Sequence, residues 1–220
     1  MLSRSNALAW LAGTALSLSL SLGAHAEGNP EAGQPAGGDP LSGEKKFYTC
    51  YGCHGLDTYK NAYPDYSVPK LRHQTAAYLI AALQEYRSGE RPHPTMHAQA
   101  SSLSDQDIAD IAAYLQGGEP IKPSTAVAGK APAQVATCVA CHGGNGTGAE
   151  QPISPTPPVL AGQHEDYLEQ ALTAYRNGRR KNAVMDSMAQ MLKTDDDIKT
   201  AATFFAGQPS TLHTASAESK

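Results

Sequence analysis

The stretches Cys50–His54 (CYGCH) and Cys138–His142 (CVACH) are two copies of the pattern Cys-x-x-Cys-His. This pattern is typical of covalent c-type haem attachment. On one helical turn, residues at positions i, i+3 and i+4 lie on the same side. Two thiols can then bond the porphyrin edge while the histidine ring turns under the iron as an axial ligand. The sequence therefore predicts two covalent haems c, attached through Cys50, Cys53, Cys138 and Cys141 and ligated by His54 and His142.

Paired cysteines have two other common uses. The four thiols, which are all the cysteines of the chain, could bind one zinc ion, and either pair could be a redox dithiol. Neither use explains why a histidine follows the second cysteine in both copies. The two pairs are also farther apart in the sequence than the pairs of a usual zinc ribbon. We therefore interpret both copies as haem-attachment motifs.

The N-terminus has the pattern of an export signal. Arg4 precedes the stretch 8–22, which is mostly Leu, Ala and Ser, and Ala24 and Ala26 are the small residues of a cleavage site. The alternative is an uncleaved membrane anchor, but a spanning helix needs about 20 mainly apolar residues and this stretch is short and interrupted by serines. We expect a signal peptide at residues 1–26 and a periplasmic mature protein.

The charge balance narrows the class of partner. The chain has 17 basic and 21 acidic side chains and a formal net charge of −4 at pH 7. This acidic balance argues against nucleic acid as a partner. Peripheral association with a membrane stays possible, and the sequence does not give the oligomeric state. Two terminal segments are predicted to be flexible from their composition, a lead at 27–39 and a polar tail at 208–220.

The mature chain consists of two repeats. Residues 69–96 align with residues 158–185 without a gap. We expect two tandem domains at 40–116 and 129–207, joined by a linker at 117–128 that is rich in Gly, Pro and small residues. Residues that are identical in the two repeats include Pro69 and Pro158, Gln74 and Gln163, Tyr78 and Tyr167, Arg91 and Arg180, and Met96 and Met185.

The apolar residues of both repeats have helical spacing. The stretch 78–86 forms one apolar stripe, and 167–175 repeats it. Ser104 and Thr194, each followed three residues later by an aspartate, are typical of helix starts. No stretch alternates with a period of two, so we expect little or no sheet. The predicted fold class is all-α, with two small helical bundles that each surround one covalently bound haem, because a core of this size needs the additional buried surface.

Methionine is the expected second axial ligand, since its neutral thioether binds haem iron and stabilises the ferrous state. Met96 is the only methionine of the first repeat. In the second repeat Met185 keeps the alignment with Met96, and Met188 is the lesser alternative. His93 and His97 flank Met96, and either could replace it in a bis-histidine haem.

The ligand histidines also need a hydrogen-bond partner that orients the ring. Pro69 and Pro158 follow them at nearly equal spacing, and we predict that the carbonyl groups of these two prolines accept the bonds. Ordinary turn prolines are the alternative interpretation. A basic cluster at 176–181, which includes Arg180, precedes Met185. It could be a solvated helix end, a docking surface, or a set of partners for haem propionates.

Taken together, these features resemble the dihaem class I cytochromes of the c4 type over residues 43–207. The stretches His142–Gly148 (HGGNGTG) and Pro158–Gln163 (PVLAGQ) follow the pattern of that family, whereas Lys70–Gln74 (KLRHQ) departs from it. The resemblance implies two cytochrome c domains packed about a pseudo-twofold axis. It also implies haems close enough for rapid electron transfer, and a role in carrying electrons toward a terminal oxidase.

We therefore expect a periplasmic dihaem cytochrome that carries electrons in a respiratory chain. It would not be an enzyme, because an iron with both axial positions filled leaves no position for a substrate. Its partners would be redox proteins, namely a respiratory donor and a terminal oxidase or dehydrogenase. Two alternatives stay open: an electron-transfer subunit of a dehydrogenase complex, and a dihaem enzyme such as a peroxidase or a thiosulfate-oxidising cytochrome.

Overall fold

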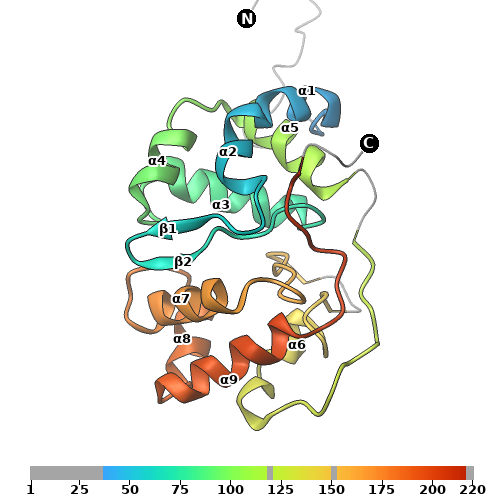
Figure 1. Cartoon of the computed structure of the whole chain (residues 1–220), viewed down its shortest axis with the longest axis vertical. Helices are drawn as coiled ribbons and strands as arrows, with labels where there is room; N and C mark the ends of the chain where they lie inside the picture. Colours follow the sequence, from blue (N-terminus) through green and yellow to red (C-terminus); the bar gives the residue numbers. More distant parts are fainter. Residues whose placement is uncertain (1–36, 118–120, 150–152, 217–220) are drawn as a thin grey trace, which may run out of the picture. The chain divides into compact units, whose positions relative to one another are not determined.

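The computed structural model describes residues 37–117, 121–149 and 153–216, and Figure 1 shows the path of the chain. The described part is mostly helical, which confirms the predicted fold class. The signal peptide expected at 1–26 and nearly all of the lead lie outside the described residues. Among the helices that are described, none has the length and apolar character to cross a bilayer.

The two halves share the order of their last three helices. The elements of the first half (residues 40–116) are α1 (Pro40–Lys46), η1 (Phe47–Cys50), α2 (Tyr51–His54), β1 (Lys60–Ala62), β2 (Asp65–Ser67), α3 (Ala76–Ser88), α4 (Pro94–Ala100) and α5 (Asp105–Gln116). Those of the second half (129–207) are η2 (Ala133–Val135), α6 (Val139–His142), α7 (Glu165–Arg176), α8 (Ala183–Gln190) and α9 (Asp195–Ala206). Helices α3, α4 and α5 thus recur in the same order as α7, α8 and α9.

Each half has an apolar core between corresponding helices. Helix α3 packs against α4 and α5, and α7 packs against α8 and α9. The first core contains Phe47, Leu79, Ile111, Ala112 and Leu115. The second contains Val135, Leu168, Leu192, Ile198, Ala201, Ala202 and Phe205. The leucines of the two predicted stripes, Leu79 and Leu83 in the first half and Leu168 and Leu172 in the second, therefore face these cores.

The last helix of each half begins with the predicted capping box. Ser104 Oγ accepts a hydrogen bond from Asp107 N, and the Asp107 carboxylate accepts one from Ser104 N at 2.9 Å. Thr194 and Asp197 repeat this arrangement at the start of α9. These reciprocal bonds satisfy backbone N–H groups that have no partner within the helix, so they fix where α5 and α9 start.

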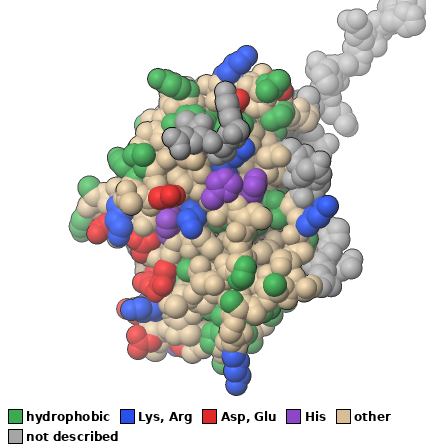
Figure 2. Space-filling model, turned by 45° about the vertical axis from the view of Figure 1, so that its right-hand side comes forward, with side chains coloured by type: hydrophobic (Ala, Val, Ile, Leu, Met, Phe, Trp, Pro, Cys, Tyr) green, Lys and Arg blue, Asp and Glu red, His purple; other side chains and the backbone are tan. Residues whose placement is uncertain are grey.

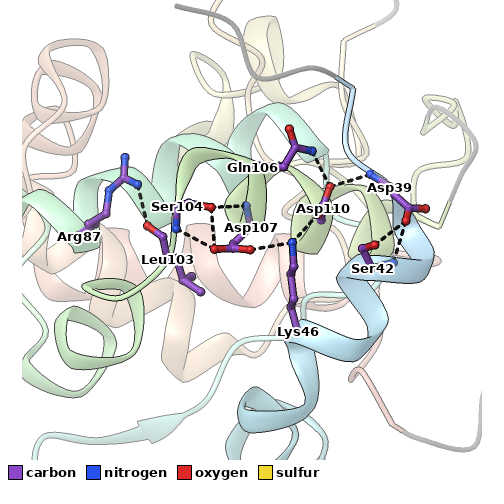
Figure 3. Close-up of polar contacts among 9 residues, drawn as sticks. All are labelled: Asp39, Ser42, Lys46, Arg87, Leu103, Ser104, Gln106, Asp107 and Asp110. Carbon is purple, nitrogen blue, oxygen red and sulfur yellow. Dashed lines mark hydrogen bonds and ion pairs between the residues drawn. The ribbon is translucent and has the colours of Figure 1, made fainter.

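Helix α1 leads into the first motif and is attached to α5 by polar contacts (Figure 3). Lys46 Nζ lies 2.6 Å from Asp107 Oδ1 and 2.6 Å from Asp110 Oδ2. The other carboxylate oxygen of Asp110 accepts from Asp39 N at 2.8 Å. Gly43 allows the close approach, because a Cβ there would lie 1.9 Å from the Asp110 carbonyl oxygen. The helix that precedes the first Cys-x-x-Cys-His motif is therefore attached to α5 up to Lys46.

A small antiparallel hairpin, formed by β1 and β2, is the sheet that the described residues contain, which agrees with the expectation of little or no sheet. The sequence did not reveal it because each strand has only three residues and lacks an alternating apolar pattern. Asp166 of α7 accepts hydrogen bonds from Ser67 N at 3.0 Å and Ser67 Oγ at 2.9 Å. The hairpin therefore joins the first half to the second.

The C-terminal segment 208–216 is packed, which corrects the prediction of a flexible tail for these residues. It returns to the first half, where Arg72 N donates to His213 O at 3.0 Å and His213 N donates to Arg72 O at 3.2 Å. Leu212 and Ala215 are buried, with Ala215 in the first core. The polar composition was misleading because two apolar residues and a few backbone bonds are enough to hold the segment.

The same segment brings two histidines together. The rings of His73 and His213 meet edge to face with centroids 4.9 Å apart, and both Nδ1 atoms donate to the carbonyl oxygen of Thr211. Figure 2 shows a pair of adjacent histidine side chains on the face that it displays. The N–H of Ala215 donates to the carbonyl of His54 at 3.1 Å, so the segment also contacts the first motif.

Candidate haem sites

Each Cys-x-x-Cys-His motif folds into a short helical turn. Cys50 ends η1 and the next four residues form α2, while Cys138 is the N-cap of α6. This turn places both thiols and the imidazole along one side. Burial raises the pKa of the Cys50 and Cys138 thiols. Within the described residues no three His, Cys, Asp or Glu side chains converge as metal ligands.

The two ligand histidines are buried and oriented in the same way. His54 Nδ1 lies 3.1 Å from Pro69 O, and His142 Nδ1 lies 3.0 Å from Pro158 O. A carbonyl oxygen can only accept, so Nδ1 has the proton in both rings and Nε2 keeps its lone pair. Burial lowers the pKa of His54 to about 4 and also lowers the pKa of His142. Both rings are therefore neutral at pH 7 with Nε2 ready to bind a metal.

A cavity of ≈ 400 Å³ lies beside the first motif. Cys50, Cys53, His54 and Met96 line it. Most of the remaining wall is apolar, with contributions from Phe47, Val68, Leu71, Leu79, Leu83, Leu103, Ile111 and Leu115. Two thiols, one imidazole, one thioether and an apolar wall are what a covalently attached haem needs, so these residues fit the group. When bound, haem supplies an iron that exchanges one electron between its ferric and ferrous states.

Corresponding capped turns position the two methionines. Met96 lies in the first turn of α4, where its N–H donates to His93 Nδ1 at 3.2 Å. Met185 lies in the first turn of α8, where its N–H donates to Asn182 Oδ1 at 3.0 Å. His93 therefore uses Nδ1 as a helix cap, a role that its asparagine counterpart performs in the second half. Met188 is also partly buried and stays an alternative to Met185.

Two buried arginines lie between the halves. Arg91 and Arg180, which hold the same position in the two repeats, are 6% and 8% exposed. Each reaches a tyrosine of the other half: Arg91 Nη2 donates to Tyr167 Oη at 3.0 Å, and Arg180 Nη2 donates to Tyr78 Oη at 3.0 Å. Of the basic cluster predicted at 176–181, Arg180 is the member that is buried.

Carboxylates of the protein compensate little of the charge of these arginines, whose guanidinium groups lie over tyrosine rings. Glu85 Oε2 lies 4.0 Å from Arg91 Nη1, and Arg180 Nε has no hydrogen-bond partner among the described residues. Burial works to raise the pKa of Tyr78, but the two guanidinium groups outweigh it and lower the pKa to about 7. Buried cations are stable only beside negative groups. The cluster therefore fits the carboxylates of a haem, since Arg91, Tyr78 and Tyr167 line the cavity.

Comparison with known proteins gives the family. The sequence profile of the cytochrome c family matches residues 42–119 and 126–207, one match in each half. The chain belongs to the cytochrome c family. Cytochrome c4 of Pseudomonas aeruginosa is 32% identical over 190 residues, which cover 78% of this chain and 90% of the relative. A protein of Stutzerimonas stutzeri named thiosulfate dehydrogenase electron acceptor is 32% identical over 212 residues, 89% of this chain and 93% of that protein.

The fold comparison agrees with the sequence comparison. The crystal structure of reduced cytochrome c4 from Pseudomonas stutzeri matches this cytochrome with a TM-score of 0.60 and 29% identity, over 78% of this chain and 100% of the other. This cytochrome is thus a c4-like dihaem electron carrier with two covalently bound haems c.

The sequence did not reveal part of the surroundings of the predicted attachment residues. The buried state of Arg91 and the contribution of Tyr66 from the hairpin to the cavity wall were not foreseen. A signal for the first existed, since Arg91 and Arg180 are identical in the two repeats. No such signal existed for Tyr66, because the hairpin precedes residue 69, where the gapless alignment of the two repeats begins.

Proposed function

We propose that this cytochrome carries single electrons in the periplasm, between a dehydrogenase and the respiratory chain, with a His/Met pair at each iron. His54 and Met96 are the axial ligands in the first half, and His142 and Met185 in the second. The observation that supports this most is the repetition of one arrangement. In both halves a neutral buried histidine donates to a proline carbonyl, and a methionine lies in the first turn of a capped helix.

The same arrangement favours a carrier over an enzyme. An iron whose two axial positions are filled by imidazole and thioether has no open position for peroxide or thiosulfate. The cap at His93 favours Met96 over His93 as the ligand in the first half, because a ring whose Nδ1 accepts from Met96 N is held to the helix start. Transfer of electrons then needs only docking with a partner, without turnover of a substrate.

The location is part of the proposal. The signal-like residues 1–26 precede the first motif, and small residues precede the expected cleavage point after Ala26. Purified mature protein should therefore begin at Glu27 when its N-terminus is sequenced from a periplasmic extract. Retention of residues 1–26 in a membrane fraction would contradict the proposed location and leave the electron-transfer role intact.

The ligand assignment is tested by spectroscopy on the mature dihaem protein. The intact mass should exceed that of the polypeptide by two haems, and the ferric protein should show the thioether-to-iron charge-transfer band. Met96→Ala should abolish the part of the band that belongs to the first haem, and Met185→Ala the part that belongs to the second. Met188→Ala is the matched control, and loss of the second contribution in this variant would transfer the assignment to Met188.

A thiosulfate dehydrogenase is a candidate electron donor. The reason is the Stutzerimonas stutzeri relative, which is named as the electron acceptor of such an enzyme and matches most of this chain. Oxidised cytochrome mixed with that enzyme and thiosulfate should be reduced, and thiosulfate alone should not reduce it. Reduction by thiosulfate without the enzyme would instead support the alternative of a thiosulfate-oxidising cytochrome.

A further inference from the structure

Two glutamines that are identical in the repeats form reciprocal bonds between the halves. Gln163 Oε1 accepts from Lys70 N at 2.9 Å, and Gln163 Nε2 donates to Lys70 O at 3.0 Å. Gln74 Oε1 accepts from Val159 N at 2.8 Å, and Gln74 Nε2 donates to Val159 O at 3.0 Å. Both side chains are buried, with 3% of Gln74 and 4% of Gln163 exposed. Each half therefore binds one backbone residue of the other half through a side-chain amide.

The bound residues are the ones that directly follow the two prolines. The N–H of Lys70 belongs to the same peptide group as the carbonyl of Pro69, and that carbonyl accepts the hydrogen bond of His54. A continuous path thus runs from the His54 ring through one peptide group to Gln163 of the other half. The second path runs from His142 through the peptide between Pro158 and Val159 to Gln74.

A peptide group that is hydrogen-bonded at both ends is polarised. When the N–H donates, electron density moves toward the carbonyl oxygen, which becomes a stronger acceptor. A stronger acceptor at Nδ1 makes the imidazole more basic at Nε2, as partners of metal-binding histidines generally do. A more basic axial ligand stabilises ferric over ferrous iron. Each glutamine is therefore placed to lower the reduction potential of the haem in the opposite half.

We propose that Gln74 and Gln163 are positioning residues through which each half tunes the reduction potential of the other half's haem. The inference rests on the proposed ligation by His54 and His142. It explains why the two halves keep these side chains in register, and it makes the potentials depend on intact packing between the halves. If the two glutamines only held the halves together, replacing one would lower the stability of the protein without changing the reduction potential of the opposite haem.

The chain offers a matched control. Gln208 is 5% exposed and makes the same pair of bonds to a single backbone residue, accepting from Ala128 N at 2.8 Å and donating to Ala128 O at 3.0 Å. The peptide groups on either side of Ala128 have no contact with a ligand histidine among the described hydrogen bonds. Gln208→Leu therefore removes equivalent bonds without interrupting either path.

The experiment is a potentiometric titration of the mature dihaem protein and its variants, with each haem followed by the NMR signal of its axial methionine. Loss of a signal in Met96→Ala assigns the first haem. Gln163→Leu should raise the potential of the first haem, and Gln74→Leu that of the second. At a fixed solution potential, we expect the ferric-to-ferrous ratio of the affected haem to fall about two- to fourfold. This size follows because each hydrogen bond in a polarised chain is strengthened by ~10–30%, and the variant loses that strengthening.

Several outcomes would overturn the proposal. An equal shift of both haems in each variant would do so, as would a shift confined to the haem of the substituted half or an equal shift in Gln208→Leu. If Gln163→Leu does not accumulate with two haems, Gln163→Glu replaces it. Its carboxylate still accepts from Lys70 N and, being charged, does so more strongly than the amide oxygen. The reduction potential of the first haem should therefore fall relative to that of the second. The Gln74 variants repeat the test independently, and absence of the charge-transfer band in the unmodified protein would refute the proposed ligation instead.

Discussion

Replacing Gly43 with alanine should destabilise the first half through a steric clash at the crossing of α1 and α5. Gly43 is buried, and a Cβ at this position would lie 1.9 Å from the carbonyl oxygen of Asp110. Ordinary contacts begin at 3.4 Å. The helices would have to separate by about 1.5 Å, and the opposing atom cannot rotate away because it belongs to the backbone of α5.

The size of the effect follows from this geometry. Adding a methyl group to a well-packed site costs ~1–3 kcal/mol in the free energy of unfolding, and contact with rigid backbone places Gly43→Ala at the upper end of this range. For a domain of this size, each kcal/mol lowers the melting temperature by roughly 4–8 °C. A loss of ~3 kcal/mol thus corresponds to a decrease of roughly 12–24 °C for the first half.

The assay is thermal unfolding of the mature dihaem protein, followed by circular dichroism and by the charge-transfer band of the first haem. Gly52→Ala is the control, since no atom of the described residues outside the local turn lies within 4 Å of a Cβ built at Gly52, and the second motif has Ala140 at this position. Alanine should be neutral or slightly favourable there, because it restricts the unfolded chain more than glycine does. A Gly43→Ala protein that melts together with the unmodified protein would refute the close crossing of α1 and α5.

Two further outcomes follow from the contacts described above. Hydrogen bonds from Lys46 and Ser104 hold the pKa of Asp107 well below its ordinary value, so stability that is present above pH ~4 should be lost as the pH falls through the folded pKa. Melting temperatures measured between pH 6 and pH 2 should therefore fall less steeply in Asp107→Asn than in the unmodified protein. An unchanged slope would exclude this carboxylate as a cause of the loss of stability in acid. Ala215 is fully buried in the first core, so Ala215→Glu should release the C-terminal segment and speed hydrogen exchange at the His213 amide. Thr211→Glu, at an exposed side chain, is the control and should not change this exchange rate. Equal protection of the His213 amide in both variants would show that the segment is held without Ala215.

The ligand histidines illustrate how far repeats in a sequence can be used. Pro69 and Pro158 were named as partners because they recur at nearly the same spacing after His54 and His142, and the structure places hydrogen bonds there. The methionine assignment stays a proposal, since Met185 and Met188 are both partly buried in the same helix. Identity in the two repeats singled out Arg91 and Arg180 as well, but it gave no information on the side chains that these arginines contact.

The amino-acid sequence by itself was enough to predict the two Cys-x-x-Cys-His turns and the starts of α5 and α9. These features depend on residues no more than five positions apart, so local geometry and chemistry are sufficient. Only the tertiary structure decided that 208–216 packs on the first half, that two arginines are buried between the halves, and that Gln74 and Gln163 bind the opposite backbone. Such contacts join residues far apart in the chain, and a buried Ala, Arg or Gln has the same identity in a sequence as an exposed one.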